Sequence, residues 1–358
     1  MTDKLDLLAH GADDLHRLAA AAFGDEQGAA LAGRLHRDAC LHGRIAPADH
    51  GLGPRAVARW RALARLELPT LAAEQRETVA TGDVLKRLLR FADGAAVESV
   101  RLPMGRGRSS LCLSTQVGCA RACTFCETGR HGLLRNLTAG EITAQVTVAC
   151  ADGRPDNLVF MGMGEPLDNL DGLLPALAVL GDRRGFAYAQ ERLTVCTVGH
   201  VPGLERLRQC GLKRLGLALS LNAADDRQRA ELMPRSARFT LAEIQRALIA
   251  YRMRRNLAIG IHWCLLPGVN DSATDAARIA RFCAPLGRVL VHVIPYNPGA
   301  QPLGRAPTAA EVEAFVAALR ANGLPVRRRL TKGRTVMAAC GQLAGDGAPA
   351  APRRSAAT

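Results

Sequence analysis

The chain has 358 residues, enough for one large domain or for a main domain with a smaller companion. Its residues are 48% hydrophobic and 4% aromatic, and no uncharged apolar run approaches the roughly 18 residues that a membrane span needs. The first residues lack a basic segment followed by an apolar stretch, so we expect a cytoplasmic protein without a membrane partner. Lys and Arg outnumber Asp and Glu by 47 to 33, which favours a nucleic-acid partner, although an Arg-rich compositional bias would give the same excess.

Residues 1–90 are expected to form a small helical accessory domain. Apolar positions recur at helical spacing in DLHRLAAAAFG and PRAVARWRALARLELP, without strong strand alternation. Arginines are frequent here, and they favour either an RNA-binding face or an ordinary solvated helix surface. These arginines are Arg34, Arg37, Arg44, Arg55, Arg59, Arg61 and Arg65.

From about residue 93, short apolar runs alternate with amphipathic stretches. The series starts with LCLSTQV before LTAGEITAQVTVAC and ends with RVLVHVIPYN before TAAEVEAFVAALRANG. Six such units predict a parallel β-sheet with helices packed outside it, either open or curled into a barrel. Functional residues should follow the carboxyl ends of the strands. We expect this core to span residues 91–346, followed by a disordered tail over residues 347–358, which are rich in Pro, Ala and Gly.

Three of the eleven cysteines lie together after the first strand of this core. Cys119, Cys123 and Cys126 have C-x3-C-x2-C spacing in a loop that contains glycines. In a reducing cytoplasm such a group indicates metal or redox chemistry rather than disulfides. Thiolates hold iron-sulfur clusters, and three ligands for the four irons of a cubane cluster leave one iron open to a substrate.

A structural zinc site is the main alternative for the three cysteines. It would need a fourth N or S ligand at short range. Cys112 could supply that ligand, but it lies inside the expected strand, and no second pair of ligands follows. Thioredoxin-like chemistry needs C-x-x-C before a helix in a different context. The remaining cysteines have no motif around them and are interpreted as structural: Cys40, Cys150, Cys210, Cys264 and Cys283.

The cysteine spacing after the first strand of a six-fold βα core resembles the radical S-adenosylmethionine (SAM) superfamily. Together with RNLTAGEI, VFMGMGEPLDN, LALSL, PYNP and AACGQLAG, it is similar to the RlmN and Cfr family, which methylates an adenine carbon in RNA. GEPL is closer to RlmN, since Cfr-like sequences tend to carry Ala where this chain has Pro166. The resemblance covers roughly residues 83–346. It implies an α/β fold, a partial (βα)6 TIM-like barrel of the radical SAM type beside the helical N-terminal domain.

The resemblance also implies the cofactors and the chemistry. One [4Fe-4S] cluster would be held by the three loop cysteines, and two SAM molecules would be used per turnover. The first SAM would methylate Cys340 of AACGQL, and the second would supply the radical that activates this methyl group for addition to the ring. Cys112 would then attack the Cys340 sulfur and leave a transient disulfide. Glu98 of VESV matches the family's proposed proton acceptor, and carbon 2 of adenine is expected rather than carbon 8.

The same match assigns the SAM contacts. Glu165 stands out among them, because a carboxylate at a strand end pairs naturally with the SAM ammonium. Three departures surround this site: Cys196 stands where the family usually has Ser, Asn222 where it has His, and Glu127 where it has a small residue. They favour a divergent branch that retains methyl transfer. The implied SAM contacts are Gly164, Glu165, Cys196, Ser220, Leu221, Asn222 and Asn297.

An RNA substrate would need its adenine extruded into the barrel mouth. We expect ribosomal RNA first and tRNA second, a flavodoxin or ferredoxin as electron donor, and a monomer. Two other functions stay open: a radical SAM enzyme acting on a peptide or small molecule, and a non-catalytic RNA-binding protein with a structural metal. Basic residues that flank the chemical motifs could grip phosphates or simply be solvated: Arg101, Arg106, Arg108, Arg130, Arg135, Arg327, Arg328, Arg329 and Lys332.

Overall fold

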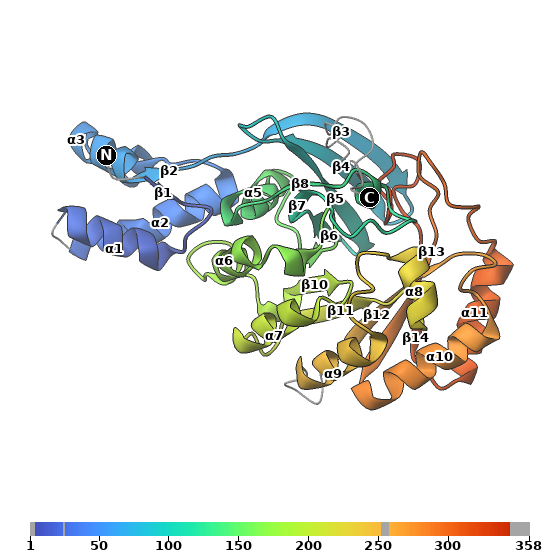
Figure 1. Ribbon diagram of the computed structural model, residues 1–358. Coiled ribbons are helices and arrows are strands. Elements are labelled where there is room, and N and C mark those ends of the chain that lie inside the picture. Colours follow the sequence, from blue (N-terminus) through green and yellow to red (C-terminus); the bar gives the residue numbers. More distant parts are fainter. Residues whose placement is uncertain (1–3, 24–25, 252–257, 344–358) are drawn as a thin grey trace, which may run out of the picture.

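The computed structural model describes residues 4–23, 26–251 and 258–343 (Figure 1). Its centre is a ten-stranded sheet in the order β14-β13-β12-β11-β10-β9-β6-β5-β4-β3. Neighbours from β6 to β14 run parallel, whereas β3, β4 and β5 are antiparallel. The strands are β3 (Thr70–Val79), β4 (Gly82–Arg90), β5 (Ala96–Gly105), β6 (Arg108–Leu113), β9 (Asn157–Phe160), β10 (Leu193–Thr197), β11 (Gly216–Ser220), β12 (Ile259–Leu265), β13 (Val289–Pro295) and β14 (Val326–Arg328).

Helices of the core follow the parallel strands and cover the outer face of the sheet. Their starts are encoded locally, because Thr138, Ser272 and Thr308 each form a capping box with an acidic residue three positions later. The helices are α4 (Glu127–Arg130), α5 (Ala139–Cys150), α6 (Leu170–Gly181), α7 (Val201–Gln209), α8 (Asp226–Leu232), α9 (Leu241–Tyr251), α10 (Ala273–Cys283) and α11 (Ala309–Ala321). Short 3-10 turns are η1 (Pro47–His50), η2 (Pro166–Asp168), η3 (Gln190–Arg192) and η4 (Ala284–Leu286).

The parallel strands are buried on the helix side of the sheet. Trp263 of β12, for example, is fully buried and stacks on Phe315 of α11 with ring centroids 6.1 Å apart. Because strand order follows chain order, each crossover moves to the next strand. Within the described residues, β14 and β3 are the two ends of the sheet, so the barrel is partial. The expected α/β fold and all six strand-helix units are confirmed.

The N-terminal helices lie at one end of the molecule, far from α10 and α11 (Figure 1). The helices α1 (Ala12–Phe23), α2 (Glu26–His42) and α3 (Pro54–Leu63) enclose a small separate core that includes Leu15, Leu35 and Trp60. A two-stranded sheet of β1 (Leu5–Asp6) and β2 (Ala64–Arg65) closes this region. No helix in the described ranges is both long enough and apolar enough to cross a membrane.

The helical character expected for residues 1–90 is wrong beyond Leu63. Residues 70–90 form the hairpin of β3 and β4, which pairs with β5 and extends the core sheet. The sequence TLAAEQRETV is rich in helix-forming residues, but its partners in the sheet decide its conformation. The tail expected at residues 347–358 lies outside the described residues.

Candidate active site

The inner face of the sheet is defined by side-chain alternation on β4, β5 and β6. Arg87 and Arg101 point outward, where their guanidinium groups donate to the main-chain oxygens of α5. Lys86, Glu98 and Cys112 lie on the opposite face, because Lys86 and Cys112 are both register partners of Val100 and Glu98 is two residues away. This inner face, where Lys86 also reaches Met337, is covered by the C-terminal segment, residues 329–343.

The C-terminal segment is attached to the cysteine loop, residues 118–128. The Glu127 main-chain nitrogen donates to the Gly341 oxygen at 2.8 Å, and the Thr128 hydroxyl donates to the Leu343 oxygen at 2.8 Å. Glu127, a departure from the family pattern, is therefore a buried anchor beside Cys340. These bonds place the AACGQL motif directly against the loop that carries the three clustered cysteines.

A second loop, after β13, holds the other side of the same segment. The Gln342 amide donates to the Pro298 oxygen at 2.8 Å, and the Asn297 amide donates to the Cys340 oxygen at 3.3 Å. Asn297, an expected SAM contact, thus supports the main chain of Cys340. Cys340 lies between the cysteine loop and the carboxyl end of β13, with its side chain exposed.

Cys340 and Cys112 are brought together across the sheet interior. Burial raises the pKa of the Cys112 thiol, and the nearby charges of Cys340 and Cys196 raise this pKa further. The Cys196 pKa is likewise raised to about 12, mainly by burial, with Cys340 among its neighbours. All three are free thiols. Cys340 and Cys112, from opposite ends of the core sequence, are therefore electrostatic neighbours on its inner face.

The cysteine loop begins with β7 (Gln116–Gly118), which pairs with β8 (Leu133–Asn136). Gly118 has φ of 78°, and an added Cβ would lie 1.9 Å from the Gly132 oxygen, so only glycine fits. Cys119 donates from its nitrogen to that same oxygen at 2.8 Å. Cys119 and Cys123 are buried, and Cys126 is half-buried.

The three loop thiols are electrostatic neighbours. Burial raises the pKa of Cys119 to about 12 and the Cys126 charge raises it too; Cys126 and Cys119 likewise raise the pKa of Cys123. Within the described residues, no three His, Cys, Asp or Glu side chains converge to hold a single metal ion. A four-iron cluster is wider than one ion, so its ligands need not meet at a point. Three soft sulfur donors in one buried loop fit such a cluster.

Glu165 lies at the carboxyl ends of β9 and β10. One carboxylate oxygen accepts from the Leu167 nitrogen at 3.1 Å and the other from the Val198 nitrogen at 2.9 Å. Burial raises the pKa of Glu165 to about 7 against these hydrogen bonds. Gly164 before it has φ of 99°, and an added Cβ would lie 2.6 Å from the Gln116 side chain. The backbone conformation and close packing at Gly164 therefore require glycine, and the two main-chain N–H groups at Glu165 are matched by a carboxylate.

The other expected SAM contacts divide into two groups. Ser220 at the end of β11 is half-buried and opposite His262 in the neighbouring strand. Asn222 is buried instead: its amide oxygen accepts from the Cys264 nitrogen at 2.9 Å, which ties it to β12. Leu221 is also buried, and its main-chain oxygen accepts from Arg229. The structure thus gives Asn222 and Leu221 roles in holding strand ends together.

Glu98 is buried beside the C-terminal segment. Its carboxylate forms an ion pair with Lys86 at 3.0 Å, and the Lys86 ammonium also donates to the Met337 oxygen at 3.4 Å. The alternative interpretation of Glu98 as an exposed strand carboxylate is wrong, since only 3% of the residue is accessible. The ion pair with Lys86 holds the Glu98 carboxylate in place on the inner face.

Sequence reasoning missed the charged residues that support these groups. Lys86 looks like an ordinary polar strand residue, and Arg229 lies in the polar stretch DDRQRAEL. Arg121, between the first two cluster cysteines, is buried and donates to the Asp168 carboxylate at 2.7 Å. Of these three residues, Arg121 alone could have been singled out from the sequence, because it lies within the cysteine motif.

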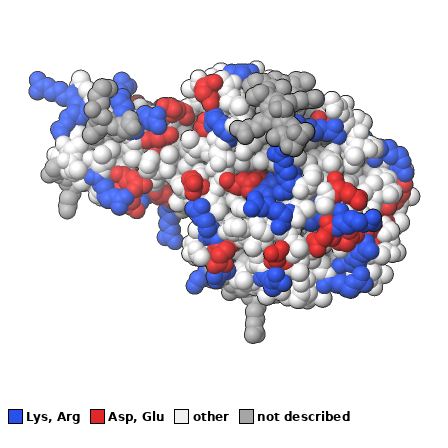
Figure 2. Space-filling model, viewed as in Figure 1, with Lys and Arg blue, Asp and Glu red and all other residues white. Residues whose placement is uncertain are grey.

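The basic surface is less continuous than its composition suggests. On the face in Figure 2, basic and acidic side chains are interspersed. Arg135 pairs with Asp93 and Glu141, and Arg328 pairs with Glu313. Others form no ion pair among the described residues and could meet phosphates: Arg106 and Arg108 at the β5–β6 turn, and Arg327 on β14.

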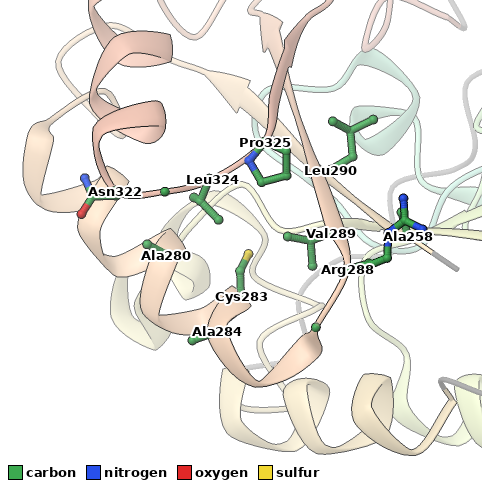
Figure 3. A pocket seen from close by; sticks show the side chains of 12 residues that line it. Ala258, Ala280, Cys283, Ala284, Arg288, Val289, Leu290, Asn322, Leu324 and Pro325 are labelled. Atoms are coloured by element: carbon green, nitrogen blue, oxygen red, sulfur yellow. The ribbon is translucent and has the colours of Figure 1, made fainter. Parts of the chain in front are cut away.

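A hollow of the described structure lies elsewhere (Figure 3). It is lined by Ala258, Val289 and Pro325, at the amino ends of β12, β13 and β14, and by Cys283 and Ala284. The expected site residues all lie outside this hollow.

Comparison with known proteins agrees with this geometry. Residues 113–282 match the family model of the radical SAM superfamily. A probable RNA methyltransferase of Sorangium cellulosum is 43% identical over 95% of this chain and 87% of its own length. A dual-specificity RNA methyltransferase RlmN of Syntrophotalea carbinolica is 41% identical over 78% of this chain and 75% of its own. A radical SAM methyltransferase structure from Sphaerobacter thermophilus has a TM-score of 0.85 at 32% identity, covering 95% of this chain and 99% of that chain. The chain therefore belongs to the RlmN family of radical SAM RNA methyltransferases.

Proposed function

We propose that this enzyme methylates carbon 2 of an adenine in RNA, with Cys340 as methyl carrier and Cys112 as the resolving thiol. One observation carries the proposal: the C-terminal segment folds back against the cysteine loop, where Cys340 and Cys112 are electrostatic neighbours. The relatives are named RNA methyltransferases, which supports RNA as the substrate class. The departures at Cys196, Asn222 and Glu127 support a divergent branch with an altered substrate fit.

The cofactors follow from the donor set. Cys119, Cys123 and Cys126 would hold one [4Fe-4S] cluster, and Glu165 with Gly164 would receive the amino end of SAM. Bound together, cluster and SAM supply a methyl group and a carbon-centred radical, with two SAM molecules used per turnover. The Glu165 carboxylate already binds two main-chain N–H groups, so its position is fixed before a ligand arrives.

The protein residues perform the remaining steps. The Cys340 sulfur accepts the methyl group and later carries its carbon to the adenine ring, which joins protein to RNA covalently. Glu98, positioned by its ion pair with Lys86, accepts the ring proton. The Cys112 thiolate attacks the Cys340 sulfur; the S–S bond forms, the S–C bond breaks, and a proton completes the methyl group on the ring. A reductant then restores the two thiols.

The substrate and partners are proposed from charge and chemistry. An extruded adenine would enter the inner face, with Arg106, Arg108 and Arg327 available for phosphates. Ribosomal RNA is the first candidate and tRNA the second. A flavodoxin or ferredoxin would supply electrons to a monomeric, cytoplasmic enzyme.

Mass spectrometry of the intact protein tests the proposal. Protein produced in cells that lack its homologues but contain SAM should carry one added methyl group on Cys340. The RNA of these cells should contain 2-methyladenosine. Cys283→Ala, a buried cysteine at the other end of the strands, serves as the matched control and should leave both signals intact. An unmethylated Cys340 would reject the carrier role and favour a peptide or small-molecule substrate. Zinc without acid-labile sulfide would instead support the metal-containing RNA-binding protein.

A further inference from the structure

Arg229 is a buried cation on the inner side of α8. Its side chain is completely inaccessible, and its guanidinium donates to the Leu221 oxygen at 2.7 Å and to the Val198 oxygen. The Nε atom is buried without a hydrogen-bond partner. In the described part of the chain, no Asp or Glu forms an ion pair with Arg229. Burial of a cation costs free energy unless an opposite charge or hydrogen bonds compensate, so a site that keeps one needs a reason.

The helix that carries Arg229 is hydrogen-bonded to the cysteine loop. The Thr124 nitrogen donates to the Leu232 oxygen at 3.0 Å, and the Thr124 hydroxyl donates to the same oxygen at 3.2 Å. Met233, at the end of α8, shares a small apolar cluster with Cys123. The Arg229 guanidinium reaches the Met233 sulfur at 3.8 Å, so it lies next to the cluster that contains the central cysteine of the motif.

Negative charge close to Arg229 comes from the functional groups themselves. Burial lowers the pKa of Arg229 to about 10, and the charges that oppose this shift are those of Cys123, Asp226 and Glu165. Asp226 is exposed on the first turn of α8, whereas Cys123 and Glu165 are buried. The buried groups whose ionised forms would act on the guanidinium are thus the proposed cluster ligand, Cys123, and the proposed SAM ligand, Glu165.

We infer that Arg229 is the internal counter-charge of the cluster: a positioning residue whose fixed positive charge stabilises the Cys123 thiolate and raises the cluster's reduction potential. This inference rests on the cluster assigned under the proposed function. One-electron reduction adds a negative charge to the cluster, and a nearby cation in a medium of low polarity favours the reduced form. Transfer of the first electron to the cluster is the step that this charge assists.

The test is a reduction titration of the reconstituted full-length protein, followed by electron paramagnetic resonance. Arg229→Gln removes the charge and keeps a hydrogen-bond donor; Arg229→Lys keeps the charge. Arg227→Gln removes an exposed charge from the same helix and is the matched control. In Arg229→Gln we expect the ratio of reduced to oxidised cluster at a fixed potential to fall at least tenfold, which equals about 59 mV for one electron. Arg229→Lys and Arg227→Gln should stay within twofold of the wild type.

Other outcomes decide against the inference. Equal potentials in Arg229→Gln and the wild type, or a tenfold fall in Arg229→Lys as well, would show that the charge does not set the potential. If Arg229→Gln does not fold, the Arg229→Lys result alone decides, since a retained charge must retain the potential. Iron and sulfide content separates the two levels: a wild-type protein that binds no cluster rejects the proposed function, whereas a bound cluster with unchanged potentials rejects only the counter-charge.

Discussion

The two ends of the parallel strands differ in what they bring together. At the carboxyl ends, Glu165, Ser220 and the cysteine loop meet the C-terminal segment, and every proposed chemical group lies there. At the amino ends lies the hollow of Figure 3, lined mostly by apolar side chains and main chain from β12, β13, β14 and the neighbouring helices. Space alone therefore does not mark the functional end of this sheet. The end proposed to be functional is marked instead by thiols, carboxylates and buried arginines that lie close together.

Cysteines illustrate the same difference. Cys283, beside the hollow, has its pKa raised to about 12 by burial alone, with no charged neighbour contributing. Cys112 is half-buried, and other thiols, Cys340 and Cys196, and the Arg329 cation act on its pKa. A buried cysteine at the amino ends is thus inert packing, and one on the inner face near the carboxyl ends belongs to a reactive group.

Replacing the proposed methyl carrier should have the largest effect. Cys340→Ala removes the only sulfur placed to carry the methyl group, so RNA methylation should fall by about a thousandfold or more. Nucleoside mass spectrometry of RNA incubated with purified enzyme measures the loss. Cys283→Ala should keep more than half of the activity; equal losses in both variants would erase the distinction between the two ends.

Replacing the resolving thiol should trap the reaction instead of preventing it. In Cys112→Ala the Cys340 sulfur can still be methylated and joined to RNA, but the thiol proposed to break the S–C bond is missing. We expect turnover to fall by about a thousandfold, with a covalent protein–RNA species that survives denaturation and disappears with ribonuclease. Its absence from Cys112→Ala, alongside normal S-methylation of Cys340, would contradict the resolving role.

The proton acceptor should contribute less than either thiol. Glu98→Gln removes the base but preserves size, and we expect a loss of about 10²- to 10⁴-fold in the methylation rate. Because Lys86 loses its carboxylate partner in this variant, Lys86→Met is measured in parallel. A rate for Glu98→Gln within threefold of the wild type would exclude Glu98 as the base.

The sequence specified the core of the fold better than its edges. Alternating apolar and amphipathic stretches predicted six of the seven described parallel strands, all except β14, since burial on the helix side demands continuous apolar runs. The β3–β4 hairpin was missed because β3 is almost wholly exposed and composed of residues such as Ala, Glu and Gln. Its conformation comes from pairing with β4, which no local pattern reveals.

The site was predictable to the extent that motifs carry it. The loop cysteines, Glu165 and Cys340 stand in recognisable segments, whereas the proximity of Cys340 to Cys112 depends on how the last fifteen described residues fold back. Arg229 was invisible because a polar helix sequence predicts a solvated face. Asn222 was expected to touch SAM, but its left-handed backbone and its bond to β12 make it a connector between strand ends.

Glu165, at the carboxyl ends of the strands, should make the free energy of unfolding depend on pH, an effect smaller than the losses of activity above. Its folded pKa is raised from 4.5 to about 7, so the native state binds the proton more tightly than the unfolded state. The contribution of Glu165 to stability is therefore complete below about pH 4.5 and is lost as pH rises through about 7, a change on the order of 2 kcal/mol. Urea unfolding of cluster-free wild type and Glu165→Gln at pH 5 and 8 measures it. The difference in unfolding free energy between the two proteins should depend on pH; a constant difference would contradict the buried, ionisable state.

Filling the hollow at the amino ends should have the smallest effect. Ala284→Leu adds a side chain at an exposed position on the rim, without touching any proposed chemical group. Methylation and iron content should stay within twofold of the wild type, and stability within about 0.5 kcal/mol, as for surface substitutions in general. A large loss of activity with unchanged stability would mean that the hollow receives a ligand, and both ends of the strands would then be functional. Unchanged methylation, iron content and stability in Ala284→Leu would confine the proposed chemistry to the carboxyl ends, where the cysteine loop and the C-terminal segment lie.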